Sequence, residues 1–246
     1  MKALILAAGY ATRLYPLTKE YPKPLLKVRG RPIIDYIVEK LESAEALNEI
    51  IVVTNSKFIS LFRKWARAKK ISKPISLVDD LTQTLEDRRG AIGDMEFAIT
   101  KKRIKDDLLV IGGDNLFNGD IRDFLSFAGS KAGSPVIGAY DIHNKSEARH
   151  YGVIRMNDES KVIDFQEKPK KPASTLVAMC LYYFPKGKLG LIRKYALDRS
   201  TGNDTTGSYI HWLKSRVQVY GFTFGGRWYD IGDHKFLNEA KRDFKN

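Results

Sequence analysis

Cysteine is almost absent from this sequence, and so are the patterns that indicate export or a membrane span. Cys180 is the single cysteine among 246 residues, which excludes an internal disulfide framework and a cysteine-based zinc site. The longest apolar runs have only the length of a β-strand, so no transmembrane helix and no membrane partner are expected. The N-terminus begins directly on a strand pattern, without a charged and then apolar leader. These absences predict a protein of the reducing cytoplasm.

Histidine is scarce, and acidic residues are outnumbered by basic ones. The four histidines show neither metal-ligand spacing nor a place in a Ser/His/Asp set. The chain has 42 Lys and Arg against 29 Asp and Glu, a net charge of +13, which is compatible with nucleic acid or a small polyanion. Because the basic residues are spread through the expected helices and not gathered into one stripe, a solvated surface is the simpler explanation. We therefore predict no nucleic-acid partner; a nucleic-acid binder is an alternative that rests on charge alone.

Apolar periodicity in the first half of the chain alternates between strand and helix. Short apolar runs predict strands at residues 2–8, 49–54, 74–79 and 107–113. Apolar spacing of three and four predicts helices at residues 32–46, 56–70 and 93–104. Strands that alternate with helices favour right-handed βαβ units and a mostly parallel sheet, so the predicted fold class is α/β.

The pattern changes after about residue 134. Strand-like runs at residues 134–142, 151–157, 161–168, 175–184 and 217–224 predict an antiparallel β extension beside the parallel core. Helices are expected near 185–199 and 205–214, and a last one at 234–244 with Asp233 as its cap. A chain of this length suits one core, so we predict a single domain, 1–246, with halves at 1–133 and 134–246.

The loop that leaves the first strand combines small residues with two cations. Residues 7–9, Ala-Ala-Gly, lack bulk, so their backbone amides can come close to an anion. Arg13 offers directional donors to phosphate oxygens, and Lys23 offers a point charge on a backbone restrained by two prolines. Asp114 ends another strand on the same edge of the sheet, where ligands of such sheets bind. A phosphate cradle and a small-residue turn with solvated cations both remain open, since neither a Walker loop nor a dinucleotide fingerprint is present.

Several segments resemble those of one enzyme family. LAAGYATRLYPLT at 6–18 with PKPL at 22–25 resembles the signature of the sugar-phosphate nucleotidyltransferases, the family of glucose-1-phosphate thymidylyl- and uridylyltransferases. GAIGD at 90–94 looks like that family's Gly-rich nucleotide loop, and IGGDNLF at 111–117 like its metal-aspartate segment. YGVI at 151–154, FQEKP at 165–169 and WYDIGD at 228–233 resemble its sugar-binding and second-metal segments. The resemblance covers essentially the whole chain and implies a three-layer, Rossmann-like nucleotide-diphospho-sugar transferase fold.

The resemblance implies an enzyme that transfers a nucleotidyl group from a nucleoside triphosphate to a sugar-1-phosphate, giving a nucleotide sugar and pyrophosphate with Mg²⁺ as cofactor. Glucose-1-phosphate with dTTP or UTP is the leading expectation. The alternatives are a mannose-1-phosphate guanylyltransferase and a cytidylyltransferase of another phosphorylated alcohol. A non-catalytic regulatory binding protein on the same fold is the alternative of another class, and a homo-oligomer is compatible with each of these.

The same resemblance assigns roles to the residues at matching motif positions. It implies catalytic roles for Arg13, Lys23 and Asp114. Nucleotide contacts are implied for Leu6, Ala7, Ala8, Gly9, Arg13, Lys23, Gln83 and Gly90. The sugar phosphate would be bound by Gly152, Glu167 and Lys168, and Mg²⁺ by Asp114 and Asp230. Because an ionised phosphate oxygen is the nucleophile, this reaction depends on positioning and charge neutralisation, without a general base.

The chain departs from the family pattern at three places. Ala11 stands where the family has its second glycine, which affects how the loop holds phosphate. Met179 and Cys180 stand where many relatives have Thr-Gly facing the sugar, and we expect Cys180 to be a small buried group, not a nucleophile. The segment 83–94 is longer and more charged than in typical thymidylyltransferases. These differences leave the sugar and the base open. Since the sequence stops at residue 246, we do not expect the β-helical acyltransferase extension of the bifunctional relatives.

Overall fold

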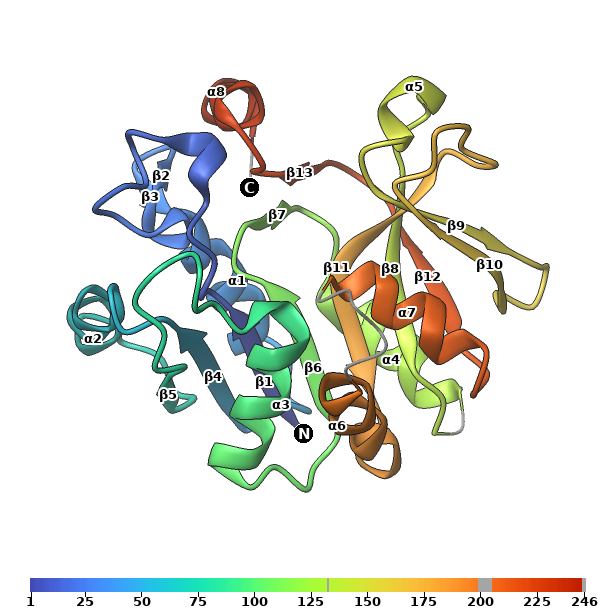
Figure 1. Ribbon diagram of the computed structural model, residues 1–246, viewed down its shortest axis with the longest axis horizontal. Coiled ribbons are helices and arrows are strands. Elements are labelled where there is room, and N and C mark those ends of the chain that lie inside the picture. The colour runs from blue at the N-terminus through green and yellow to red at the C-terminus, as the bar shows by residue number, and fades with distance from the viewer. Residues whose placement is uncertain (132, 199–204, 245–246) are drawn as a thin grey trace.

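Parallel strands lie at the centre of the protein, in a computed structural model that describes residues 1–131, 133–198 and 205–244 (Figure 1). The first half contains β1 (Lys2–Leu6), β2 (Lys27–Val28), β3 (Arg31–Pro32), α1 (Ile33–Glu42), β4 (Glu49–Thr54), α2 (Ile59–Arg67), β5 (Ile75–Asp79), α3 (Gly90–Lys102), β6 (Leu108–Gly112), β7 (Asn115–Phe117) and α4 (Ile121–Ser130). The second half contains β8 (Val136–Asp141), α5 (Lys145–Ala148), β9 (Gly152–Met156), β10 (Val162–Glu167), β11 (Leu176–Phe184), α6 (Leu189–Leu197), α7 (Thr206–Lys214), β12 (Tyr220–Phe224), β13 (Trp228–Asp230) and α8 (His234–Asp243).

The main sheet has the strand order β10-β9-β11-β6-β1-β4-β5, with β8 pairing β11 and β12. The strands β5, β4, β1 and β6 are parallel, whereas β11 is antiparallel to β6. After β5 the chain crosses to the other side of β1, so the order of the strands reverses between β1 and β6. Ligands of α/β sheets bind beyond the carboxyl ends of the strands at such a reversal. The predicted α/β class with a mostly parallel core is confirmed. The second half is only partly antiparallel as predicted, because β8, β9 and β10 pair antiparallel with their neighbours β11, β10 and β9, whereas β12 pairs parallel with β8.

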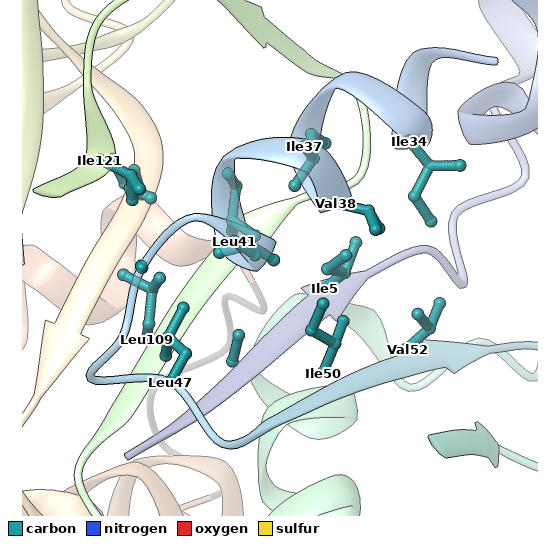
Figure 2. Packing of buried hydrophobic residues seen from close by; sticks show 14 of the residues in the cluster. Ile5, Ile34, Ile37, Val38, Leu41, Leu47, Ile50, Val52, Leu109 and Ile121 are labelled. Carbon is teal, nitrogen blue, oxygen red and sulfur yellow. The ribbon is translucent and has the colours of Figure 1, made fainter. Parts of the chain in front are cut away.

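Helices cover both faces of the parallel strands. Alternate residues of a strand point to opposite faces. Ile5 of β1 and Val52 of β4 pack with α1, α2 and α4, whereas Leu4 and Val53 pack with α3, α6 and α7 on the other face. Figure 2 shows the first of these layers, where side chains of α1 meet those of β1 and β4. This burial on both faces explains why the strand sequences read as continuous apolar runs.

A smaller apolar cluster joins the two ends of the chain. Leu14, from the loop after β1, lies with Leu237 and Phe244 of the C-terminal segment and with Leu116 and Ile231 of the β7–β13 region. Figure 1 shows α8 close to the β2–β3 hairpin and to β13. Asp233 caps α8 by accepting a hydrogen bond from the Phe236 amide at 3.1 Å, as predicted. The cluster fixes the loop after β1 against the segment that carries residue 230.

The structure differs from the predicted elements in several places. Helix α4 and the two-stranded pairs β2–β3 and β7–β13 were not predicted. Helix α3 begins at Gly90, three residues before the predicted start at 93, so residues 90–94 are helical and do not form a loop. The helix expected at 185–199 is shorter, Leu189–Leu197, and its last expected residue lies outside the described ranges. Within those ranges no helix combines the length and apolarity that crossing a bilayer requires.

Candidate active site

A cavity of about 1030 Å³ is lined by residues from both halves of the chain. Arg13 and Gly90 reach it from the first half, and Gly152, Glu167 and Lys168 from the second. The C-terminal part adds a wall made of Asp230, Gly232, Asp233, Lys235 and Phe236. Side chains of both charge signs therefore meet in one concave surface, which suits a ligand that carries both anionic and hydroxyl groups.

Two carboxylates are brought together by the short β7–β13 ladder. Asp114 immediately precedes β7, and Asp230 ends β13 opposite Asn115. The Ile231 amide donates to the Asp114 carbonyl across this ladder, with an N···O distance of 3.4 Å. Burial raises the pKa of Asp230 to about 6, and the negative charge of Asp114 contributes to the rise. Asp230 lines the cavity, whereas Asp114 is not among the lining residues. Two neighbouring carboxylates that repel each other favour a cation between them.

Lys23 supplies such a cation within the chain. Its ammonium donates a hydrogen bond to the Asp114 carboxylate and forms an ion pair with it. Burial acts to lower the pKa of Lys23, but attraction to Asp114 and Asp230 outweighs it and the pKa is raised, so Lys23 stays charged at neutral pH. The side chains of Lys23 and Asp114 are still 17% and 24% exposed, which leaves both within reach of an incoming ligand.

Arg13 faces the same cluster from the loop after β1. It lies in the 3-10 turn Thr12–Leu14, whose Leu14 is buried in the apolar cluster with Ile231. The guanidinium lies over Gly232, where a Cβ atom would come within 3.6–3.8 Å of it. Its positive charge lowers the pKa of Asp230 against the effects of burial and of Asp114. The four predicted residues Arg13, Lys23, Asp114 and Asp230 are thus brought together.

The loop after β1 reaches the cavity through Arg13, whereas the predicted nucleotide-binding residues 6–9 are not among the residues that line it. The Asn55 side-chain amide donates to the Ala8 carbonyl at 2.9 Å, and the Ala7 amide donates to the Val53 carbonyl at 2.9 Å. Gly9 is exposed, with open space where a Cβ would stand. Ala11 has a φ of 49°, a left-handed conformation that favours glycine. The chain therefore keeps a glycine-like backbone at residue 11 even though its side chain is alanine.

Leu6 contributes to this loop through its backbone. Its carbonyl accepts a hydrogen bond from the Gly113 amide at 2.8 Å, and its side chain packs against the core layer that contains Leu4. Residues 6 and 112 are register partners in the parallel pair β1–β6. The prediction that the loop after β1 and Asp114 share one edge of the sheet is confirmed by this register. A direct nucleotide contact by Leu6 remains a prediction.

The segment predicted to bind the nucleotide is only partly at the cavity. Gly90, with a φ of 72°, and Ala91 line the cavity at the start of α3. Gln83 is exposed, and it is not among the described residues that line this cavity. The backbone amide of Gln83 donates a hydrogen bond to a carboxylate oxygen of Asp87 at 3.0 Å within the same loop. The structure thus places Gly90 at the site and leaves Gln83 beside it, because the intervening residues form a compact turn.

The three predicted sugar-side residues lie together on β9, β10 and the turn after β10. Glu167 is half-buried, and burial raises the pKa of its carboxyl while neighbouring Lys168 opposes the rise. A Cβ at Gly152 would lie 2.5 Å from the Phe165 ring, so this glycine is required for packing. Its predicted contact with the sugar remains a prediction. A Cβ at Gly207 would lie 1.7 Å from Glu167 Oε2. The carboxylate therefore rests directly on the Cα of Gly207.

Several residues that line the cavity were not predicted from the sequence. They are Arg88, Arg149, Tyr151, Thr206, Gly207 and Lys235. The sequence carried a signal for one of them, since a glycine in the first turn of a predicted helix at 205–214 is costly unless something needs the space. The basic residues gave no signal, because they resemble the other exposed lysines and arginines of the chain.

Cys180 was expected to be a small buried group, but the structure also places it at the cavity. It packs against the same core layer as Leu4 but also lines the cavity. Burial raises the pKa of its thiol to about 12, and the negative charges of Asp114 and Asp230 add to the rise. The thiol is therefore neutral at physiological pH, in agreement with the expectation that it is not a nucleophile.

The carboxylate pair fits the predicted Mg²⁺. Across the described residues, no group of three or more His, Cys, Asp and Glu side chains is placed to hold a metal ion. Mg²⁺ is commonly bound by one or two carboxylates together with phosphate oxygens and water, so a complete protein cage is not required. The mutually repelling Asp114 and Asp230 beside an open cavity have this donor chemistry.

Comparison with known proteins settles the family. A family model described as nucleotidyl transferase matches residues 2–246. The chain belongs to the nucleotidyl transferase family. This nucleotidyl transferase is 30% identical over 233 residues to a putative mannose-1-phosphate guanyltransferase of Sulfolobus acidocaldarius, covering 94% of this chain and 60% of the relative. It is 29% identical over 243 residues to the bifunctional protein GlmU of Methanocaldococcus jannaschii, covering 98% of this chain and 54% of that protein.

Solved structures share the fold of this nucleotidyl transferase. A putative glucose-1-phosphate thymidylyltransferase from Bacillus anthracis has a TM-score of 0.78 at 24% identity, with 100% of this chain and 97% of that chain covered. A UDP-glucose pyrophosphorylase complexed with UDP-glucose has a TM-score of 0.80 at 21% identity, with 98% and 96% covered. The predicted Rossmann-like nucleotide-diphospho-sugar transferase fold is confirmed. The chain spans little more than half the length of the curated relatives it matches.

Proposed function

We propose that this protein is a sugar-1-phosphate nucleotidyltransferase, which joins a nucleoside triphosphate to a sugar-1-phosphate and releases pyrophosphate. The observation that carries the proposal is the charge cluster of Lys23, Asp114 and Asp230, with Arg13 beside it, at the edge of a cavity lined by residues of both halves. Both substrates of the proposed reaction are anions, so bringing them together requires positive charge where they meet. In this proposal residues 1–133 bind the nucleotide and residues 134–246 bind the acceptor.

The reaction forms a bond between an oxygen of the sugar phosphate and the α-phosphorus of the nucleotide. The bond from the α-phosphorus to the oxygen that bridges to the β-phosphorus breaks, and pyrophosphate leaves with that electron pair. The attacking oxygen is already ionised near neutral pH, so no residue has to remove a proton from it. The protein contributes position and charge, which is the usual source of catalysis in phosphoryl transfer.

Lys23 and Arg13 hold the phosphates in this scheme. Lys23 exchanges its bond to Asp114 for phosphate oxygens, which its remaining exposure allows. Arg13 holds the β- and γ-phosphates with its fork of donors and stabilises the departing pyrophosphate. Asp114 and Asp230 would hold Mg²⁺, which when bound supplies positive charge to the phosphate oxygens. In this scheme backbone amides of Ala8, Gly9 and Gly90 border the nucleotide, and Gln83 contacts its base.

The acceptor occupies the second half of the cavity. Glu167 accepts hydrogen bonds from hydroxyl groups, since its carboxylate lies half-buried on the cavity wall. Lys168 binds the acceptor phosphate from an exposed position at the end of β10. Gly152 lets the ring of the acceptor come close to the backbone. Glucose-1-phosphate with dTTP or UTP is the leading pair, supported by the names of two proteins with the same fold.

Mannose-1-phosphate with GTP is the second candidate, because a relative at 30% identity is named as a guanyltransferase of that sugar phosphate. A cytidylyltransferase of another phosphorylated alcohol is the third. A regulatory protein on the same fold is disfavoured physically. Such a protein has no need for two neighbouring carboxylates whose repulsion, together with burial, raises the pKa of Asp230 to about 6.

The test is pyrophosphate release across sugar phosphates and nucleotides, with and without Mg²⁺. We expect turnover with at least one pair, dependence on Mg²⁺, and a loss of at least about 100-fold in Asp114→Asn and Asp230→Asn. Each variant leaves Lys23 one carboxylate partner, so folding should persist, which a thermal unfolding curve checks. Asp158→Asn, in the exposed turn after β9, is the matched control. Full turnover in either site variant would refute the assignment, and tight salt-sensitive DNA binding without turnover would favour the nucleic-acid alternative.

A further inference from the structure

Cys180 has a backbone conformation that is unusual for its place in the fold. Its φ is +52°, in the left-handed region, although it lies inside strand β11. The other described non-glycine residues with positive φ lie in turns, loops or beyond the ends of helices and strands. A side chain in this region costs free energy that glycine would avoid. Such an outlier is retained where the surrounding structure requires the residue, which makes it a reason to look for function.

The strand is distorted at this residue. In the pairing of β11 with β8, Ala178 is opposite Ala139 and Tyr182 is opposite Ile137, so three residues of β11 face one residue of β8. Bulges of this kind redirect side chains and are common beside active sites. Here the side chain of Cys180 lines the cavity together with those of Ala178 and Tyr182. Cys180 therefore presents its side chain to the cavity from the distorted part of the strand.

Hydrogen bonds connect the bulge to the β7–β13 ladder, beside which the two carboxylates lie. Asn115 Nδ2 donates to the Cys180 carbonyl at 3.1 Å, and Asn115 Oδ1 accepts from Trp228 Nε1 at 2.7 Å. Asn115 and Trp228 belong to the β7–β13 ladder. A Cβ placed on Gly112 would be 3.2 Å from Cys180 Sγ and 2.8 Å from Asp114 Oδ1, so the thiol and that carboxylate are near neighbours.

On its other side Cys180 adjoins the hydroxyl-binding end of the cavity. Tyr182, the next cavity-lining residue of β11, is hydrogen-bonded to the side chains of both Cys180 and Thr206 and feels the charge of Glu167. The thiol thus lies between the carboxylates at the reacting phosphates and the carboxylate that holds hydroxyls. In the proposed reaction the acceptor phosphate lies toward the first carboxylates and the hydroxyls toward Glu167, which would place the carbon next to the phosphate-bearing carbon over the thiol.

We propose that Cys180 is a specificity-determining residue, whose side chain fills the cavity floor and selects sugar-1-phosphates with a small substituent on the carbon next to the phosphate-bearing carbon. The inference rests on the proposed function, since it concerns the acceptor of that reaction. A glycine at this position would take the same φ without strain and leave the floor open. In this inference the side chain acts through its bulk, since it lines the cavity where glycine would leave open space.

The experiment compares Cys180→Gly and Cys180→Ala with the wild type on two acceptors. Glucose-1-phosphate has a hydroxyl on the carbon in question, and N-acetylglucosamine-1-phosphate has an acylamino group there. We expect the wild type to prefer the hydroxyl. The ratio of kcat/KM should shift toward the acylamino acceptor by about tenfold or more in Cys180→Gly, and by less in Cys180→Ala. A second pair of acceptors that differ at carbon 6, far from the phosphate, should show no shift.

Ser160→Gly is the matched control. Ser160 has a φ of +63° in the turn between β9 and β10, away from the cavity-lining residues, so its replacement relieves the same kind of backbone strain. We expect its acceptor ratio to equal that of the wild type. An unchanged ratio in both Cys180 variants of an active enzyme, or an equal shift in Ser160→Gly, would overturn this inference and leave the proposed function intact. Absence of turnover with every substrate pair would overturn both.

Discussion

Gly207→Ala is the substitution whose effect the structure defines most sharply. The new Cβ would lie 1.7 Å from Glu167 Oε2 and 2.6 Å from its Cδ, far inside any tolerated contact. Gly207 is the second residue of α7 and is buried, so the helix cannot easily move away. The Glu167 carboxylate therefore has to retreat by more than about 1 Å, which is enough to break a hydrogen bond of ordinary length.

The magnitude follows from the bond that is lost. A hydrogen bond from a neutral hydroxyl to a charged carboxylate contributes about 1.5–3 kcal/mol, which corresponds to about a 10- to 100-fold decrease in kcat/KM for the acceptor. The KM of the nucleotide should change little, because the proposed function places Glu167 on the acceptor side of the cavity. Steady-state kinetics with each substrate varied in turn measures the two effects separately.

A matched control and a rescue variant complete this test. Gly190 is the second residue of α6 and is exposed, with open space where a Cβ would stand, so Gly190→Ala should leave the kinetics unchanged. Adding Glu167→Asp to Gly207→Ala shortens the acid and should restore part of the stability lost to the clash. If Gly207→Ala kept the wild-type kcat/KM for the acceptor, the contact between Glu167 and the sugar hydroxyls would be refuted.

Two further predictions concern the scaffold. Burial would raise the pKa of Glu49, but hydrogen bonds from Lys2, Ser76 and Lys102 lower this pKa from an ordinary 4.5 to about 2. The stability that the ionised Glu49 contributes is therefore present above pH 4.5 and is lost as the pH falls toward 2. Chemical unfolding of Glu49→Gln should show a loss of about 1–2 kcal/mol at pH 7 that vanishes near pH 2, and a loss independent of pH would contradict the ion-pair explanation. Gly113→Ala places a Cβ 2.9 Å from the Leu6 carbonyl oxygen, so we expect the melting temperature of the protein to fall by several degrees. An unchanged melting temperature would contradict the conclusion that this close contact between β1 and the residue after β6 leaves no room for a side chain.

The parallel core could be predicted from the sequence because strands that are buried on both faces consist of consecutive apolar residues. Strands such as β4 read as unbroken apolar runs, and their helices repeat at three and four residues. The first loop and Asp114 could be placed on one edge of the sheet, because parallel strands end together. Helix α4 was not predicted, although the sequence marks it with Asp120 as its cap and with a buried face that includes Phe124.

The rest of the site depends on contacts that no local pattern encodes. The β7–β13 ladder pairs three residues with three residues from the far end of the chain, too few for a periodic signal. Gln83 was expected at the base, but a turn closed by Asp87 keeps it outside the cavity lining. The support that Gly207 gives to Glu167 and the left-handed backbone of Cys180 arise from packing between strands and a helix, which becomes visible only in three dimensions.

The charge cluster also explains how the protein tolerates its own site before substrates arrive. Two carboxylates held near each other with little access to water would be costly, because a buried charge without a partner destabilises a protein by about 3–5 kcal/mol. Lys23 pairs with Asp114, and the positive charges of Lys23 and Arg13 both oppose the rise in the pKa of Asp230. The same two cations are the groups that the proposed reaction directs to phosphate. In the proposed reaction these cations would turn to the substrates, and Asp114 and Asp230 would then be free to hold a divalent cation, which would supply the positive charge that they lose. We therefore expect substrate binding and metal binding to be coupled through one set of charges, with each strengthened by the other.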